Sequence, residues 1–289
     1  MSLDFFGYLF GKLKINMNNV IKNFYCDFII LKIKNLSFSE KVIFLSRKYL
    51  YLILKISKVK FDKIKLLNYE YISDDDFGLL SAQIMLKDYY KYYFIRNIEK
   101  PVIFDVGAHI GNFSIASNVF YKDCKVYSFE PVKSTFDILS FNIANYVNIK
   151  VFNIALGKEN KRDVMFFSNS EKDRSSFFKD NILNQENLNT QEIEIKTISS
   201  IVKEFDILVI DILKIDVEGF EYEVIEGASD ILNRVKFVIV ENHLKDHPHN
   251  FAKISKILTD NNFILYRIGK IWSDENNQIS VFDLIYKKL

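Results

Sequence analysis

Short apolar runs alternate with amphipathic stretches over most of the chain from residue 102 onward. Runs of about five apolar residues predict strands, whereas apolar positions spaced three or four residues apart predict helices. The predicted strands are Val102 to Val106, Lys125 to Phe129, Ile149 to Leu156, Leu213 to Val217, Val235 to Val240, Phe263 to Ile268 and Ile279 to Tyr286. The predicted helices are Asn112 to Tyr121, Ser134 to Asn145, Glu221 to Leu232 and Phe251 to Asp260.

This alternation of strand and helix predicts an α/β fold whose sheet is mainly parallel. We expect seven strands, the last two of which form an antiparallel edge pair joined by a connection that contains Trp272. Arg162 to Phe167 and Gln191 to Thr197 could form a further antiparallel pair. Between them, Ser168 to Thr190 predicts a long insertion that is either a lid or substrate platform, or a disordered excursion.

The N-terminal quarter of the chain differs in charge from the rest. Residues 1–70 hold 13 Lys and Arg against 5 Asp and Glu, a balance of +8, whereas the whole chain carries +2. Large apolar residues interrupted by lysines predict helices there, at Phe24 to Leu31 and Val42 to Ile56. We therefore expect a basic helical N-terminal region at 1–75 and the main domain at 76–289.

Three interpretations of this basic region stay open. A helical cap would pack its apolar stripe on the main domain and leave its lysines in solvent. A peripheral membrane or anionic-glycan surface would place the lysines near headgroups. Nucleic-acid binding is the weakest interpretation, because no recognition-helix pattern accompanies the lysines. Ser73 to Asp76 predicts a linker or cap before a helix from Phe77 to Ile95.

Composition narrows the class of protein further. Apolar residues make up 49% of 289 residues, which is enough for a sizeable core. The two cysteines, Cys26 and Cys124, give neither a disulfide framework nor a metal-binding spacing, so a cytoplasmic location is expected. The chain lacks the basic start of a signal peptide, and no apolar run reaches the roughly 18 residues of a spanning helix.

The connection after the first predicted strand carries candidate nucleotide-binding residues. Asp105, Gly107 and Gly111 form the pattern D-x-G-x-x-x-G, and Glu130 closes the next strand. Gly107 lets the backbone turn sharply off the strand, and a carboxylate at Glu130 would accept hydrogen bonds from both ribose hydroxyls. His109 occupies the place of a middle glycine, which suits a pyrophosphate poorly. The pattern therefore favours S-adenosylmethionine over NAD.

Six blocks of sequence share their order and spacing with one known family. They are FDVGAHIGNFS at 104–114, YSFEP at 127–131, NIALG at 153–157, the serine pair at 175–176, KIDVEGFEYEVIEGA at 214–228 and VENH at 240–243. On these blocks, which span about half of the chain, it resembles the FkbM family of S-adenosylmethionine-dependent methyltransferases. The family differs in often having Asn at His109, and in having T-L-D where this chain reads Thr197-Ile198-Ser199.

The resemblance implies a Rossmann-like class I methyltransferase fold and roles for individual residues. Asp105, Gly107 and Gly111 would line the methionine end of the cofactor. Glu130 would hold the ribose, and Ala155 with its neighbours would lie by the adenine. The implied cofactor-binding set is Asp105, Gly107, Ala108, His109, Gly111, Asn112, Glu130, Pro131, Ala155 and Leu156.

Four side chains are candidates for the chemistry of transfer. Asp216, Glu218, Glu241 and His243 follow predicted strands at their carboxyl ends, where ligands bind in open α/β sheets. A sugar hydroxyl needs a base, and His243 and Asp216 rank first for that role. A capping or surface role for His243 is the alternative. No metal site is assigned, although Asp216, Glu241 and His243 could together bind a divalent ion.

The expected function is O-methylation of a sugar or glycan hydroxyl in surface polysaccharide or glycolipid biosynthesis. The alternatives are N-methylation of an amino sugar or protein side chain, and a cofactor-binding module without catalysis. The strand end K-I-D-V-E-G differs from the N-P-P-Y type of adenine methyltransferases, so a nucleic-acid acceptor is not expected. The expected partner is a small-molecule or glycan acceptor, met in the cytoplasm or at the membrane periphery through the basic region.

Overall fold

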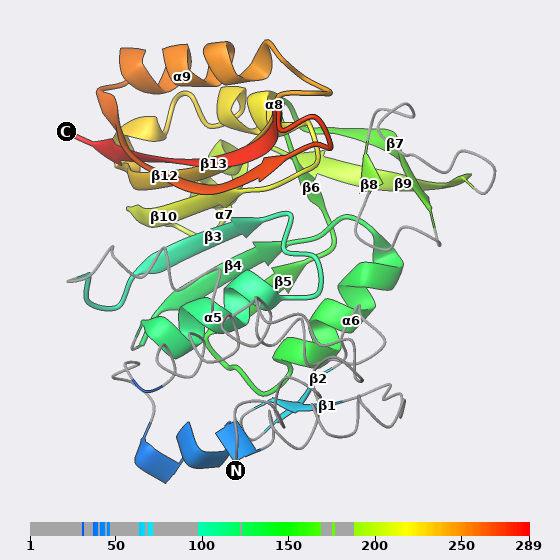
Figure 1. Ribbon diagram of the computed structural model, residues 1–289, viewed down its shortest axis with the longest axis vertical. Coiled ribbons are helices and arrows are strands. Elements are labelled where there is room, and N and C mark those ends of the chain that lie inside the picture. The colour runs from blue at the N-terminus through cyan, green and yellow to red at the C-terminus, as the bar shows by residue number, and fades with distance from the viewer. Residues whose placement is uncertain are drawn as a thin grey trace, which may run out of the picture.

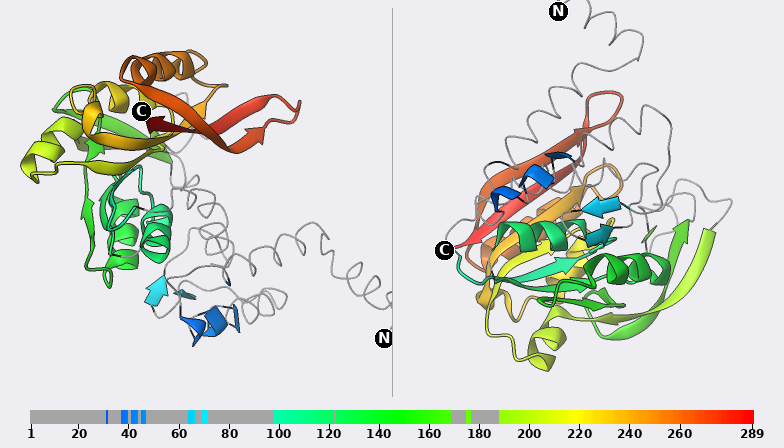
Figure 2. Two further views of the ribbon diagram at one scale, coloured as in Figure 1. Left: turned by 90° about the vertical axis from the view of Figure 1, so that its left-hand side faces the viewer. Right: turned by 90° about the horizontal axis from the view of Figure 1, so that it is seen from below.

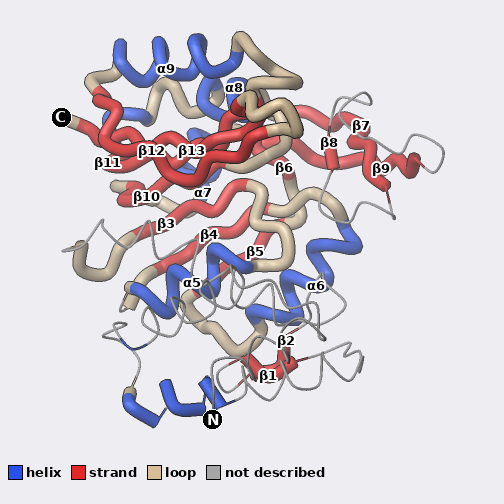
Figure 3. The backbone as a smooth tube through the Cα atoms, viewed as in Figure 1, coloured by secondary structure: helices blue, strands red, loops and turns tan. Residues whose placement is uncertain are grey.

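A computed structural model describes residues 31, 37–39, 41–43, 45–46, 64–66, 69–71, 98–121, 123–168, 175–176 and 188–289. Its centre is a seven-stranded sheet with helices on both faces (Figures 1 and 3). The strands of this sheet are β3 (Val102–Val106), β4 (Lys125–Phe129), β5 (Ile149–Phe152), β10 (Ile210–Ile215), β11 (Val235–His243), β12 (Phe263–Ser273) and β13 (Ile279–Lys288).

The strands run in the order β12-β13-β11-β10-β3-β4-β5. β13 is antiparallel to both of its neighbours, whereas β11, β10, β3, β4 and β5 are mutually parallel. The predicted seven-stranded, mainly parallel α/β sheet with a final antiparallel pair is therefore confirmed. The β12–β13 hairpin extends well beyond the rest of the sheet (Figure 2).

Helices cover both faces of the sheet, which explains why its central strands are almost wholly apolar. One face carries α5 (Asn112–Phe120) and α6 (Lys133–Ile143), and the other carries α8 (Glu221–Glu226) and α9 (Asn250–Asp260) (Figure 1). Successive strand residues point to opposite faces. Ile103 thus joins the core under α5, whereas Phe104 joins the larger core under α8 and α9.

A second sheet of four strands stands beside the main one, in the order β6-β9-β7-β8. Its strands are β6 (Ala155–Leu156), β7 (Lys161–Ser168), β8 (Ser175–Ser176) and β9 (Leu188–Lys196). β7 and β9 form the predicted antiparallel pair. The insertion predicted between them lies mostly outside the described residues.

Two predicted elements end earlier in the structure than expected. The strand expected at Ile149 to Leu156 breaks at Asn153, whose side-chain amide donates to the carbonyl oxygens of Glu130 and Pro131 at 2.9 and 2.8 Å, so β6 leaves the main sheet. The helix expected to reach Leu232 ends at Gly227, where a Cβ would meet the carbonyl oxygen of Gly157 at 1.9 Å. A 3₁₀ turn follows at Leu232–Arg234.

Helix α7 (Ile198–Glu204) was not predicted, because the polar start of the segment resembles a loop. Thr197 begins it by accepting a hydrogen bond from the backbone N–H of Ser200 at 3.0 Å. The helix then buries Ile201 and Val202 in the core on the α8 and α9 side. Ser199, which replaces the acid of the family pattern, thus lies in the first turn of a capped helix.

The described part of the N-terminal region is not all helical. Residues 41–43 and 45–46 are helical, but β1 (Ile64–Leu66) and β2 (Tyr69–Tyr71) form an antiparallel pair, so the helical prediction is wrong for these two short segments. β2 contacts α6, and Leu45 packs against the core under α5.

The remaining N-terminal predictions stay untested. Most of Phe24 to Leu31, and all of Ser73 to Asp76 and Phe77 to Ile95, lie outside the described residues. The boundary between residues 75 and 76 stays a prediction. Among the residues that are described, no helix has the length and apolar content needed to cross a membrane.

Candidate functional site

The connection from β3 to α5 is a tight turn that only glycine permits at its start. Gly107 has φ 77°, and a Cβ on it would lie 1.8 Å from the backbone oxygen of Asp216. The N–H groups of Gly107 and Ala108 both donate to the carbonyl oxygen of Phe129, at 3.1 and 3.0 Å. The turn is therefore clamped between the carboxyl ends of β10 and β4.

Two further residues of this turn also have left-handed backbone. His109 has φ 50°, a region that histidine tolerates better than most residues, so it can replace a glycine here. Gly111 has φ 98° and precedes α5, and a Cβ on it would press on the side chain of Leu139 at 2.9 Å. Asn112 is the first residue of α5 and is partly exposed.

Glu130 holds the turn from the end of β4. One carboxylate oxygen accepts from the N–H of His109 at 3.0 Å, and the other accepts from the N–H of Val132 at 3.0 Å. The residue is 5% exposed, and this burial raises its pKa above the ordinary value. Each oxygen keeps a second lone pair, so the carboxylate can still accept hydrogen bonds from a ligand.

Asp105 lies beneath the turn and is fully buried, which raises its pKa. Its Oδ2 accepts from the hydroxyl of Ser114 at 2.6 Å, and that hydroxyl lies 2.7 Å from the hydroxyl of Ser128. The structure therefore shows Asp105 anchoring α5 to the sheet. Its predicted contact with the methionine end of a cofactor stays a prediction.

Pro131, Ala155 and Leu156 lie where β4 meets the second sheet. All three are buried, and Ala155 packs in a small core with Val132. Gln191 joins the two sheets here, since its amide donates to the carbonyl oxygen of Pro131 and accepts from the N–H of Lys133, both at 3.0 Å. Sequence reasoning missed Gln191, because nothing distinguishes it from the other polar residues that alternate with apolar ones along β9.

The four predicted transfer residues come together at the neighbouring strand ends. Asp216 and Glu218 follow β10, whereas Glu241 and His243 end β11. The Nε2 atom of His243 lies 3.0 Å from Oε2 of Glu241 and 3.8 Å from Oε2 of Glu218. Asp216 and Glu241 share a hydrogen bond between their carboxyl groups. The four side chains therefore form one cluster, and a single bound ligand could contact several of them.

The charges in this cluster are unequal. Burial and the charge of Asp216 raise the pKa of Glu241 well above its ordinary value. Burial would also raise the pKa of Asp216, but the ammonium of Lys214 and its hydrogen bonds hold that pKa below its ordinary value. The proton between the two carboxyl groups therefore belongs to Glu241, and Asp216 is the ionised partner.

The structure distinguishes the two candidate bases by their protonation. Burial alone would lower the pKa of His243, but its hydrogen bond with Glu241 and the negative charges around it, Glu221 foremost, raise it to about 10. At neutral pH the imidazole is thus protonated and has no free lone pair to accept a proton. Asp216 is ionised, and its side chain is 31% exposed, so its role as the base stays a prediction that these observations favour.

A pH-dependent stability follows from the raised pKa of His243. Because the folded value of about 10 exceeds the unfolded 6.5, the stabilisation is complete below pH 6.5 and is lost as the pH rises through 10. We expect the melting temperature to fall across this interval more steeply in the wild type than in His243→Gln, measured by differential scanning fluorimetry. Parallel curves for the two proteins would contradict the raised pKa.

Sequence reasoning missed two residues that build this cluster. Glu221 is buried and accepts from the N–H groups of Val217 and Gly219 at 3.2 and 2.9 Å, which fixes the turn that carries Glu218. Lys214 is also buried, and its ammonium lies 3.1 Å from Oδ2 of Asp216. A lysine inside an otherwise mostly apolar strand was the signal that could have found Lys214.

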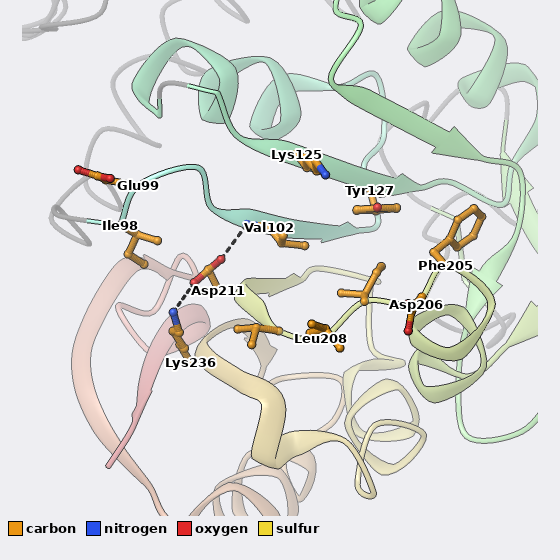
Figure 4. Close-up of a pocket in the computed structure, with 12 residues that line it drawn as sticks. Ile98, Glu99, Val102, Lys125, Tyr127, Phe205, Asp206, Leu208, Asp211 and Lys236 are labelled. Carbon is orange, nitrogen blue, oxygen red and sulfur yellow. Dashed lines mark hydrogen bonds and ion pairs between the residues drawn. The ribbon is translucent and has the colours of Figure 1, made fainter.

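A cavity of about 490 Å³ opens at the other end of the sheet (Figure 4). It lies at the amino ends of the strands, where Val102, Lys125 and Lys236 line it. Ligands of open α/β sheets bind at the carboxyl ends instead. We therefore assign the functional site to the glycine turn and the acidic cluster.

The fold and this site define a Rossmann-like methyltransferase that uses S-adenosylmethionine. The model of the methyltransferase FkbM domain matches residues 105–265, which is more than half of the chain, so the chain belongs to the FkbM methyltransferase family. The resemblance found in the sequence blocks is thereby confirmed.

Two curated relatives are named as methyltransferases. The chain is 29% identical over 182 residues to the hexuronic acid methyltransferase AglP of Haloferax volcanii, covering 58% of this chain and 71% of the relative. It is 25% identical over 229 residues to the methyltransferase sdnD of Sordaria araneosa, covering 68% and 87%. Among solved structures, precorrin-6y C5,15-methyltransferase of Geobacter metallireducens matches with 13% identity and a TM-score of 0.41, covering 72% and 88%.

The described residues fit S-adenosylmethionine at the glycine turn. The cofactor carries a nucleoside without phosphate, so it needs close backbone approach and an acceptor for ribose hydroxyls more than it needs cations. Gly107 supplies a turn with no side chain, and Glu130 supplies a carboxylate with free lone pairs at the end of β4. The individual contacts of Ala108, His109, Asn112, Pro131, Ala155 and Leu156 with the cofactor stay predictions.

Proposed function

We propose that the protein methylates a hydroxyl group of a sugar residue in a glycan or glycolipid, as a step in making a surface polysaccharide. The observation that carries the proposal is the position of Asp216, a partly exposed carboxyl group whose backbone lies against the glycine turn at the carboxyl end of β10. A hydroxyl is a weak nucleophile, so a carboxylate that accepts its proton during transfer has a clear use.

When bound, S-adenosylmethionine supplies a methyl group on a sulfonium, which is already electrophilic. The protein must therefore align the acceptor oxygen, exclude water and receive one proton. In the proposal, Asp216 receives that proton. Glu241 stays protonated beside it, and the imidazolium of His243 balances the surrounding carboxylates.

A sugar acceptor is supported by the hexuronic acid methyltransferase of Haloferax volcanii, which is 29% identical over the aligned residues. That protein's name specifies its acceptor as a sugar acid. By analogy we place a sugar ring against Asp216 and Glu218, both of which are partly exposed at the end of β10. We also propose that the reaction occurs in the cytoplasm, with the basic residues 1–70 facing an anionic partner such as a membrane surface.

The test is a transfer assay with purified protein, isotopically labelled S-adenosylmethionine and three sets of acceptors: neutral, uronic-acid and amino-sugar oligosaccharides. We expect a product heavier by one methyl group whose label survives mild alkali, as an ether does. Release of the label by alkali would reveal a methyl ester on a sugar carboxylate instead. Transfer to the amino sugars alone, with an N-methyl signal in the NMR spectrum, would overturn O-methylation.

Metal removal separates two interpretations of the acidic cluster. One ligand atom each from Glu218, Glu241 and His243 lies within 4.8 Å of the others, a spacing that a divalent ion could use. In the structure, however, Glu241 is protonated and the imidazolium of His243 already balances the charge of Glu218. We therefore expect turnover to stay unchanged after dialysis against EDTA, and loss of turnover that Mg²⁺ or Mn²⁺ restores would contradict this.

A further inference from the structure

Lys214 is a buried lysine in the middle of the sheet. It lies on β10 with 6% of its surface exposed, and its ammonium sits 5.6 Å from the ring centre of Phe113 in the first turn of α5. A buried ammonium is costly unless acceptors surround it. The position of Lys214 must therefore be explained by what its ammonium contacts.

The ammonium has acceptors on two strand ends. It lies 3.1 Å from Oδ2 of Asp216 at the end of β10. It also lies 3.4 Å from Oδ1 of Asp105 on β3, its direct neighbour in the strand register, and donates to the carbonyl oxygen of Gly107 at 3.4 Å. The two carboxyl groups thus supply the opposite charge that a buried ammonium needs.

The two strand ends that Lys214 joins have different tasks. Gly107 begins the turn that receives the cofactor, whereas Asp216 faces the acceptor as its base. The backbones also touch, because the N–H of Asp216 donates to the carbonyl oxygen of Val106 at 3.0 Å. The backbone alone fixes where Asp216 begins, but only a side-chain contact can fix the direction of its carboxylate.

We propose that Lys214 is a positioning residue for methyl transfer, because its ammonium fixes the carboxylate of Asp216 relative to the glycine turn of the cofactor site. The proposal deepens the function proposed above and rests on it. In-line transfer needs the acceptor oxygen, its base and the methyl group aligned, and a misplacement of about 1 Å can cost roughly a hundredfold in rate.

A purely structural role is the competing explanation. In that case Lys214 would only compensate the buried carboxylate of Asp105. Lys214→Met alone does not separate the two explanations, since it leaves Asp105 buried without its cation and can unfold the protein. The double variant Asp105→Asn/Lys214→Met removes the charges of both buried neighbours, Asp105 on β3 and Lys214 on β10. It should therefore be more stable than Lys214→Met alone, while it still lacks the cation beside Asp216.

The chain offers a matched control at the opposite end of the same strands. Lys236 pairs with the buried Asp211 at 2.8 Å, and Asp211 also accepts from the N–H of Val102 at 2.8 Å (Figure 4). The double variant Asp211→Asn/Lys236→Met therefore removes a lysine–aspartate pair from β10 and β11 without touching the carboxyl ends of these strands.

The experiment compares the full-length wild type with both double variants by three measurements. They are the melting temperature, the affinity for S-adenosylhomocysteine by isothermal titration calorimetry, and kcat and KM for the sugar acceptor that the transfer assay identifies. For Asp105→Asn/Lys214→Met we expect a melting temperature within a few degrees of the control. We expect its S-adenosylhomocysteine affinity to fall about tenfold and kcat about a hundredfold, with an unchanged KM for the acceptor. The control should match the wild type in affinity and kcat.

Wild-type affinity and kcat in Asp105→Asn/Lys214→Met would overturn the proposal and leave Lys214 a structural counterion. The failure of the proposed function looks different. If the wild type binds S-adenosylhomocysteine but methylates no sugar, the acceptor assignment fails. The affinity comparison still decides the role of Lys214 in that case, because equal affinity in the wild type and the double variant overturns it.

Discussion

Gly107→Ala is expected to abolish cofactor binding. The new Cβ would lie 1.8 Å from the backbone oxygen of Asp216, and the residue would have to keep a φ of 77°. Backbone atoms of two central strands cannot give way, so the turn itself must open. We expect the affinity for S-adenosylhomocysteine, measured by isothermal titration calorimetry, to fall by more than about a hundredfold, with a stability loss of roughly 1–3 kcal/mol from strain alone.

Gly157→Ala is the matched control, because it adds the same methyl group close to the second sheet. There the Cβ would meet only the side chains of Ile195 and Phe220, each at 3.0 Å. These side chains can shift by a few tenths of an ångström, so we expect affinity within a few-fold of the wild type. A folded Gly107→Ala protein that binds S-adenosylhomocysteine as tightly as Gly157→Ala would show that the turn does not receive the cofactor.

Asp216→Asn is expected to remove most of the turnover while leaving cofactor binding nearly intact. The amide cannot accept the proton of the sugar hydroxyl, and base catalysis of this kind contributes about 10²–10⁴-fold. We therefore expect kcat with the sugar acceptor identified in the transfer assay to fall by at least about a hundredfold. The affinity for S-adenosylhomocysteine should change by less than about tenfold, because Gly107 and Glu130 are unaltered.

Asp260→Asn serves as the control for this variant. Asp260 is the last residue of α9, shortly before the start of β12, where it pairs with Lys256 and is 60% exposed. It should keep wild-type kcat. If Asp216→Asn also keeps wild-type kcat, Asp216 is not the base. Glu241 or His243, each of which must first lose its own proton at high pH, would then be the next candidate.

The sheet could be predicted from the sequence because burial on both faces imposes its own pattern. Strands such as Val102 to Val106 are short and almost wholly apolar, and amphipathic helices separate them. The glycine turn could be predicted for a related reason. A positive φ at Gly107 and Gly111 restricts the residue type, so the requirement is visible in the sequence itself.

Element ends were harder to predict, since contacts with distant residues determine them. Asn153 ends β5 by bonding to the backbone after β4, and Gly227 ends α8 where it approaches Gly157. Neither partner is near in sequence. β1 and β2 were missed for a different reason, because their short apolar pattern fits a helix as well as a strand pair.

The residue types at the transfer site were predictable, but their protonation was not. Asp216, Glu241 and His243 follow strand ends in the sequence, and the structure brings them together. An isolated histidine suggests a base at neutral pH. Only the three-dimensional arrangement shows that Glu218, Glu221 and Glu241 surround His243 and raise its pKa to about 10. Lys214 and Glu221 were missed because their partners become visible only after folding.

The central claim is that the turn at Gly107 and the carboxylate of Glu130 hold the nucleoside of S-adenosylmethionine. A crystal structure of the full-length protein with S-adenosylhomocysteine tests it most directly. We predict the ribose hydroxyls within hydrogen-bonding distance of Glu130 and the amino-acid end beside the turn from Gly107 to Gly111. A ligand bound elsewhere, for example in the cavity at the amino ends of the strands, would contradict the claim.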